Sequence, residues 1–134
     1  MKVLSLAALA LLALSGAAHA QSADPSGTYV SETGETRVRI ARCGAAWCGT
    51  IVSVKGETKD ANNPDPSLRN RSLVGVQMIS NIQPTADGWN GSLYNYKDGK
   101  TYAGKMKIKG NALELSGCVL GGLICRAQTW AKAS

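Results

Sequence analysis

The chain has 134 residues, a formal net charge of +6, 15 glycines and no phenylalanine. Its only histidine is His19, near the start, so removal of the first residues would leave none for a catalytic triad. The positive charge is modest and no nucleic-acid recognition motif accompanies it, so we do not expect a nucleic-acid partner.

Residues 1–20 have the pattern of a cleaved export signal. Lys2 provides a positive start, Val3 to Leu14 form an apolar run, and Ala18-His19-Ala20 is a small-residue cleavage site. A run of about 12 residues is shorter than the roughly 20 that cross a bilayer. We therefore expect residues 21–134 to form a single periplasmic or secreted domain that does not span the membrane.

Strand patterns dominate the rest of the chain. Arginine alternates with apolar residues over 36–42, which predicts a half-buried strand, and residues 49–55 are rich in β-branched side chains. Further strands are predicted at 73–80, 89–96, 102–109, around 113–115, and at 127–132.

Two connections between these strands stand out. Asp98-Gly99 predicts a two-residue type I′ hairpin turn, and a second turn is expected around Pro84 to Gly88. Residues 56–72 form a long loop whose prolines exclude a regular helix, with one helical turn at most over Ser67 to Arg71. Loops of that length inside a compact domain are usually functional or disordered.

About eight short strands joined by short turns predict an all-β domain. Eight antiparallel strands close naturally into a small up-and-down barrel, because closure removes both exposed sheet edges. A two-sheet sandwich is the alternative. The abundant glycines favour the barrel, where they suit corners and bulges.

The four cysteines of an exported chain predict two disulfides. Three pairings are open, and we favour the local ones, Cys43 with Cys48 and Cys118 with Cys125, because each pair flanks a glycine-containing turn. A zinc site fits less well, since the second pair is spaced more widely than zinc ligands usually are. A redox motif at Cys48 would need a second cysteine at position 51, where the chain has Ile51.

The long loop carries polar groups that could bind a ligand. Arg69 and Arg71 could clamp a carboxylate or phosphate, or could instead form ion pairs with loop carboxylates. Paired carboxylates can perform acid–base chemistry or bind calcium, but the loop departs from the EF-hand pattern and no hydrolase motif is present. We therefore predict no enzyme, metal site or cofactor. The candidate binding residues of the loop are Asp60, Asn63, Asp65, Arg69 and Arg71.

Aromatic side chains with polar tips could complete such a site. They suit a half-wet cavity, although they could equally fill core positions. The candidates are Trp89, Tyr94, Tyr96 and Tyr102. On the strand at 102–109, Lys105, Lys107 and Lys109 alternate with apolar residues and predict a solvated outer face.

The order of motifs along the chain resembles an exported bacterial family called domain of unknown function 2147. The resemblance covers essentially all of residues 21–134 and rests on these segments: Asp24-Pro25-Ser26-Gly27-Thr28-Tyr29, Cys43-Gly44, Cys48-Gly49, Asp60 with Asn63-Pro64-Asp65-Pro66, Leu68-Arg69-Asn70-Arg71-Ser72-Leu73-Val74-Gly75, Trp89-Asn90-Gly91-Ser92-Leu93-Tyr94, Asp98-Gly99-Lys100-Thr101-Tyr102, Leu115-Ser116-Gly117-Cys118 and Gln128-Thr129-Trp130. It implies a compact, lipocalin-like β-barrel and no known activity. Tyr29 departs from the family pattern, where tryptophan is more frequent.

Two functions are compatible with these observations. The first is a monomeric binding module that holds a small amphipathic or anionic ligand in the barrel mouth, with Arg69 and Arg71 holding its charge. The alternative is an envelope interaction protein with a packed barrel, which binds a protein or a wall polymer through its basic face.

Overall fold

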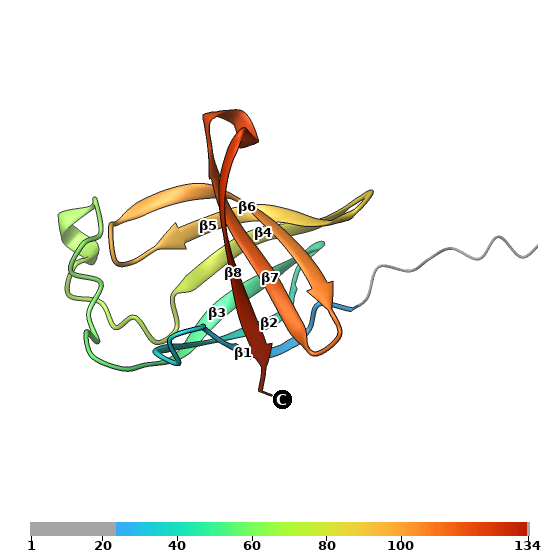
Figure 1. The fold of residues 1–134 in the computed structure, drawn as a ribbon. Helices are drawn as coiled ribbons and strands as arrows, with labels where there is room; N and C mark the ends of the chain where they lie inside the picture. Colours follow the sequence, from blue (N-terminus) through green and yellow to red (C-terminus); the bar gives the residue numbers. More distant parts are fainter. Residues whose placement is uncertain (1–23, 134) are drawn as a thin grey trace, which may run out of the picture.

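The computed structural model describes residues 24–133, so the predicted export signal at residues 1–20 lies outside the described residues. Eight strands form one closed barrel in which each strand pairs antiparallel with the next and β8 pairs back with β1 (Figure 1). The strands are β1 (Gly27–Val30), β2 (Thr36–Cys43), β3 (Ala46–Val54), β4 (Gln77–Thr85), β5 (Gly88–Asn95), β6 (Lys100–Lys109), β7 (Ala112–Val119) and β8 (Ile124–Lys132). Two single-turn 3-10 helices, η1 (Pro66–Leu68) and η2 (Leu120–Gly122), complete the fold.

The prediction of an eight-stranded antiparallel barrel is confirmed, and the sandwich is excluded by the closure between β1 and β8. That closing seam is short, because it joins only Tyr29 with Lys132 and Val30 with Ala131. No helix in the described part of the chain has the length and hydropathy that a membrane crossing needs.

The alternating patterns located β2 and β6 closely, but two local predictions were wrong. The strand expected at 73–80 begins only at Gln77 and continues through Pro84 to Thr85. Leu73 and Gly75 lie in the loop before this strand. The Leu73 amide donates to the Thr58 carbonyl within the loop, and the Gly75 amide donates to the Ile51 carbonyl of β3.

The hairpin between β5 and β6 also differs from its prediction. Its loop contains four residues, 96–99, and closes through a hydrogen bond from the Gly99 amide to the Asn95 carbonyl (2.8 Å). The Asp98 carboxylate accepts from the Lys100 amide (2.9 Å), which favours this wider loop over the expected type I′ turn. Only Gly99 adopts the left-handed conformation there, with φ of 73°.

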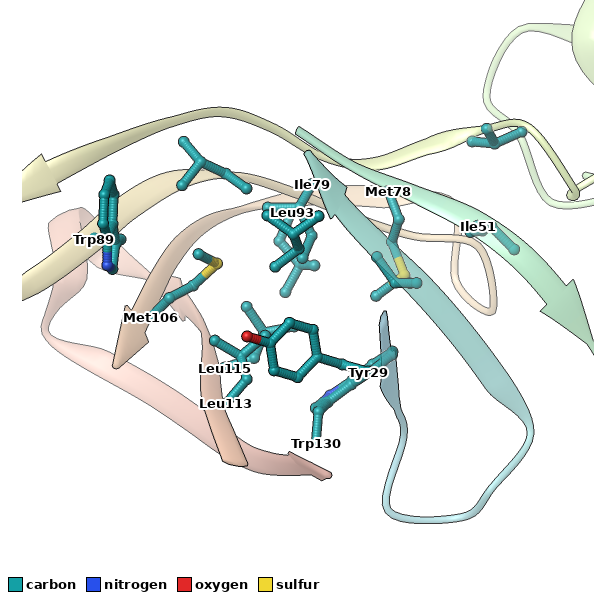
Figure 2. Packing of buried hydrophobic residues seen from close by; sticks show 14 residues of the cluster. Tyr29, Ile51, Met78, Ile79, Trp89, Leu93, Met106, Leu113, Leu115 and Trp130 are labelled. Carbon is teal, nitrogen blue, oxygen red and sulfur yellow. The ribbon is translucent and has the colours of Figure 1, made fainter. Parts of the chain in front are cut away.

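Apolar side chains from all eight strands fill the barrel interior. Figure 2 shows Trp89 and Met106 toward one end of this cluster and Met78 and Ile51 toward the other. At the Trp89 end, Trp47 packs edge-on against Trp89 with ring centroids 6.4 Å apart, and the Arg42 guanidinium lies over the Trp47 ring. Tyr29 is fully inside, and its hydroxyl donates to the Pro25 carbonyl.

A row of glycines crosses the inner side of the barrel. Gly91, Gly104 and Gly117 are paired in register on three neighbouring strands, and Gly117 in turn pairs with Arg126 on β8. A Cβ atom on Gly91 would lie 2.6 Å from the Ser80 carbonyl oxygen, so the backbones approach too closely there for any side chain. Small residues at these positions let the sheet turn sharply into a barrel.

Both predicted local disulfides are present, and no described cysteine is free. Cys43 and Cys48 close the β2–β3 hairpin, and Cys118 and Cys125 face each other directly across β7 and β8. The four sulfurs therefore form two separate disulfides, one in each of these two hairpins.

Candidate functional site

A partly enclosed cavity of about 330 Å³ lies at one end of the barrel. The β1–β2 loop, the β5–β6 hairpin and the β7–β8 hairpin surround its opening. The main residues of the floor and rim are Glu32, Glu35, Thr36, Met78, Leu93, Tyr96, Lys97, Asp98, Tyr102, Leu115, Gly117, Arg126, Gln128 and Trp130.

The floor of the cavity is apolar. Met78, Leu93, Leu115 and Trp130 are buried there, because each lies at an inward-facing position of its strand. Gly117 keeps the space above them open, since it has no side chain at an inward-facing position next to Leu93. The floor can therefore accept a short aliphatic or aromatic group.

The Trp130 indole N–H is buried and has no hydrogen-bond partner among residues 24–133. A buried donor without an acceptor carries a desolvation cost of about 1–3 kcal/mol. This donor belongs to a side chain of the cavity wall.

Two contacts join the β1–β2 side of the rim to the β5–β6 hairpin. The Lys97 ammonium forms an ion pair with Glu35, and the hydroxyls of Thr36 and Tyr96 are hydrogen-bonded. The hydrogen bond to Glu35 raises the pKa of Lys97 above its ordinary value, so this cation persists at all physiological pH values. These contacts form a strap across one side of the opening.

The other rim carboxylates are also engaged. Glu32 accepts from the Thr129 amide (2.6 Å), and Asp98 accepts from the Tyr102 hydroxyl. The hydrogen bond to Asp98 raises the pKa of Tyr102, which therefore remains a neutral donor. Arg126 differs from these groups, since no described carboxylate lies within ion-pair distance of it. Its guanidinium is the cation of the rim that is available to a ligand.

Most of the loop residues predicted as ligands form a separate network outside the cavity. Asp60 is 0% exposed and accepts from the Tyr94 hydroxyl (2.6 Å), the Asn63 amide (2.8 Å) and Arg71 Nε (2.9 Å). Burial raises the pKa of Asp60, but these three donors together outweigh it and hold the pKa below its ordinary value. Burial and the bond to Asp60 raise the pKa of Tyr94 to about 12.

This network holds the loop 55–76 against the barrel. The Asn62 amide donates to the carbonyls of Tyr96 and Lys97, so the loop grips the tip of the β5–β6 hairpin that forms part of the rim. Arg69 donates to the Asn63 carbonyl (2.8 Å), and the exposed Asp65 caps η1. The loop therefore positions the rim but does not line the cavity.

The structure thus divides the predicted site residues into three groups. Tyr96 and Tyr102 line the cavity. Trp89 lies away from it, in the packed half of the interior beside Trp47. The loop network gathers Asp60, Asn63, Asp65, Arg69, Arg71 and Tyr94.

Arg126, the cation at the mouth, was not among the predicted site residues. Arg126, Gln128 and Trp130 alternate along β8 and line the same cavity. That period-two pattern was visible in the sequence, and the favoured pairing of Cys118 with Cys125 would have placed Arg126 opposite Gly117. The two disulfide-bonded cysteines together with this alternation were the signal that could have found it.

A family model described as "Uncharacterized protein conserved in bacteria (DUF2147)" matches residues 27–132. Among solved structures, the chain is similar to protein HP1028 from Helicobacter pylori, which is described as belonging to the lipocalin family. The two chains are 27% identical, the TM-score is 0.73, and the match covers 83% of this chain and 84% of that one. No curated protein matches the chain.

Proposed function

Because this chain belongs to the bacterial family DUF2147 and folds as a barrel of the lipocalin type, we propose that it binds a small amphipathic anion in its mouth. The apolar part of the ligand lies on Met78, Leu93 and Leu115, and its charged group meets the guanidinium of Arg126. The observation that carries this proposal is the pairing of an apolar floor with one uncommitted cation at the rim.

The size of the cavity supports a small ligand. Its volume of about 330 Å³ lies at the lower end of the range of roughly 300–1,000 Å³ in which ligand sites are found. An eight-stranded barrel has room for filling side chains or for one small ligand. Here the Trp89 end is packed and the Met78 end is hollow, which leaves space for one short chain.

The choice of an anion depends on how the rim charges are used. Three carboxylates and two cations line the opening, so the formal net charge of the rim is negative and does not by itself attract an anion. Each carboxylate, however, accepts a hydrogen bond within the protein, and Lys97 is paired with Glu35. Arg126 can present two parallel N–H donors to an incoming carboxylate.

The proposal places this binding outside the cytoplasm. Two disulfides in a chain of this size are typical of oxidising compartments, and the predicted export signal would deliver it there. We propose a binding protein, with no catalytic role, because the cavity combines an apolar floor with rim groups that are held in hydrogen bonds.

Calorimetric titration with n-alkyl carboxylates of increasing chain length tests this function. We expect the affinity to rise with each methylene until the cavity is full, and Arg126→Gln to weaken binding by about tenfold, the loss expected for one charged hydrogen bond. Arg37→Gln is the matched control, since Arg37 is exposed on the outer face of β2.

To test the preference for an anion, the affinities of the carboxylates are compared with those of n-alkylammonium ions and n-alkanols of equal chain length. Tighter binding of the ammonium series than of the carboxylates would show that the rim carboxylates dominate, and would overturn the assignment of an anion. Equal affinity of wild type and Arg126→Gln for every carboxylate would remove Arg126 from the site.

A further inference from the structure

The tip of the β7–β8 hairpin concentrates the exposed aliphatic surface of the protein. Four of the six large apolar side chains that are exposed among residues 24–133 lie there. They are Val119 (42%), Leu120 (68%), Leu123 (86%) and Ile124 (58%). Figure 1 shows this hairpin rising beyond the rest of the barrel, so the apolar surface is a narrow projection and not a groove.

The tip contains a non-glycine residue, Leu120, in a left-handed backbone conformation that a simple turn does not need at a leucine. Leu120 has a φ of 54°, in the left-handed region where glycine and asparagine are favoured and leucine is strained. Gly121 and Gly122 follow in the same region. A turn that served only to join β7 and β8 would be more stable with asparagine at position 120. The presence of an exposed leucine there is therefore better explained if its side chain is buried against a binding partner.

The base of the tip is rigid. Cys118 and Cys125 are bonded directly across the two strands, immediately before and after the apolar residues. The disulfide therefore holds the four aliphatic side chains together as one unit and reduces the entropy lost when they are buried against a partner.

Two cations flank the tip. The Lys105 ammonium lies beside Gly122, and Arg126 follows the disulfide directly. No acidic residue occurs from position 115 to the end of the chain, and no described carboxylate pairs with Lys105. The surface thus combines an aliphatic point with flanking cations.

We propose that this hairpin tip, residues 119–124, docks the protein onto anionic lipid bilayers. A projecting aliphatic point enters the boundary between headgroups and acyl chains, while flanking lysine and arginine side chains contact anionic headgroups. A protein partner would need a groove that matches the point, whereas a fluid bilayer accommodates it without one. Docking places the barrel mouth against the membrane surface, because Gly117 and Arg126 at the base of the same hairpin line the cavity.

Co-sedimentation with vesicles tests the docking. For this test, all variants are produced with export in the same bacterial host. Intact-mass measurement then checks that they share one N-terminus, so that any apolar leader contributes equally to binding. Vesicles of phosphatidylglycerol and phosphatidylcholine in equal parts are compared with vesicles of phosphatidylcholine alone. We expect wild type to sediment with the anionic vesicles, and less as salt rises from about 0.05 to about 0.5 M.

The double variant Leu120→Asn with Leu123→Asn changes no charge, and asparagine tolerates the backbone at position 120. We expect its partition onto anionic vesicles to fall by about tenfold or more, with a melting temperature at least equal to that of wild type. Lys105→Gln lowers partition by about fivefold. Val74→Asn, which replaces a side chain that is 50% exposed elsewhere, leaves partition unchanged.

Three results would overturn the proposal. The first is the absence of wild type from both types of vesicle. The second is sedimentation of the double variant to the same extent as wild type, and the third is a loss of partition in Val74→Asn as large as in the double variant. Elution of wild type as a dimer that the double variant converts to a monomer would assign the tip to self-association instead. Ligand binding is measured without vesicles, so failure here is distinct from failure of the proposed function.

Discussion

Asp60 shows how one buried carboxylate can act as an anchor. It lies outside the cavity, yet its hydrogen bonds with Tyr94 and Asn63 and its ion pair with Arg71 fix the loop that grips the rim. The Arg71 side chain is 38% exposed, so the ion pair is partly screened by solvent and the two neutral hydrogen bonds contribute substantially.

Replacing Asp60 with asparagine is expected to lower the free energy of unfolding by about 2 kcal/mol at neutral pH, because buried donors lose their charged acceptor. The pKa of Asp60 is lower in the folded protein than in the unfolded chain, so its contribution is present above about pH 4 and is lost as pH falls further. Urea unfolding at neutral and acidic pH measures this. Asp65→Asn keeps an acceptor oxygen at the exposed cap of η1 and serves as the control, with a smaller loss.

If Asp60→Asn unfolded with the same acid dependence as wild type, the carboxylate would not be the anchor described here. The sequence indicated that Asp60 and Arg71 could form an ion pair. Ion pairs with loop carboxylates were the alternative to a ligand-binding role for the loop arginines. It could not indicate that Asp60 is buried, because burial depends on Tyr94, which is 34 residues away in the chain.

The loop 55–76 and the β5–β6 hairpin fit together through one close backbone contact. A Cβ atom on Gly99 would lie 1.9 Å from the Asn62 carbonyl oxygen, so only glycine allows the loop to reach the hairpin. Asn62 then donates to the hairpin carbonyls from the same position. The two elements that shape the rim are therefore matched at Gly99.

We expect Gly99→Ala to destabilise the protein more than Gly34→Ala does. Both glycines have positive φ, which costs about 1 kcal/mol for alanine, but nothing lies within 4 Å of the Gly34 position. The additional loss at Gly99 reports the contact with Asn62. Thermal unfolding together with limited proteolysis of the loop measures it, and equal losses for the two variants would contradict the contact.

Strand positions were predictable where inward and outward faces differ in polarity. The alternation of lysine with apolar residues located β6, whereas β4 was misplaced because Leu73 and Val76 are buried like strand residues although they lie in the loop. The Asp98-Gly99 pair suggested a shorter turn than the one observed. Its conformation depends on the contact with Asn62, which no local pattern contains.

At the scale of the whole molecule, the barrel is packed at one end and hollow at the other. Closure and strand number followed from the strand patterns, but the hollow did not, since it depends on which inward positions carry glycine. Gly91 and Gly104 are required by close backbone approach, with Cβ positions 2.6 Å and 3.2 Å from carbonyl oxygens. Gly117 instead faces side chains and lines the cavity, and a Cβ atom there would lie at an ordinary contact distance of 3.4 Å from Leu93.

Filling the hollow should therefore be possible without unfolding the barrel. We expect Gly117→Val to keep the free energy of unfolding within about 1 kcal/mol of wild type while alkyl carboxylate affinity falls by about tenfold. Gly104→Val is the matched control and should be clearly destabilised by the Gly91 carbonyl. Unchanged ligand affinity in Gly117→Val, measured by calorimetry, would place the binding site elsewhere.

The seam between β1 and β8 has a further consequence. Both disulfides lie within hairpins of adjacent strands, so neither fastens the first strand to the last. The barrel is held closed there by two residue pairs, by the bond from the Ala133 amide to the Thr28 carbonyl, and by the bond from the Thr129 amide to the Glu32 carboxylate. We therefore expect the barrel to open first at this seam, and one of the two strands that would separate, β8, carries Trp130. For a ligand too wide for the cavity opening, separation of β1 from β8 would provide a second route into the barrel.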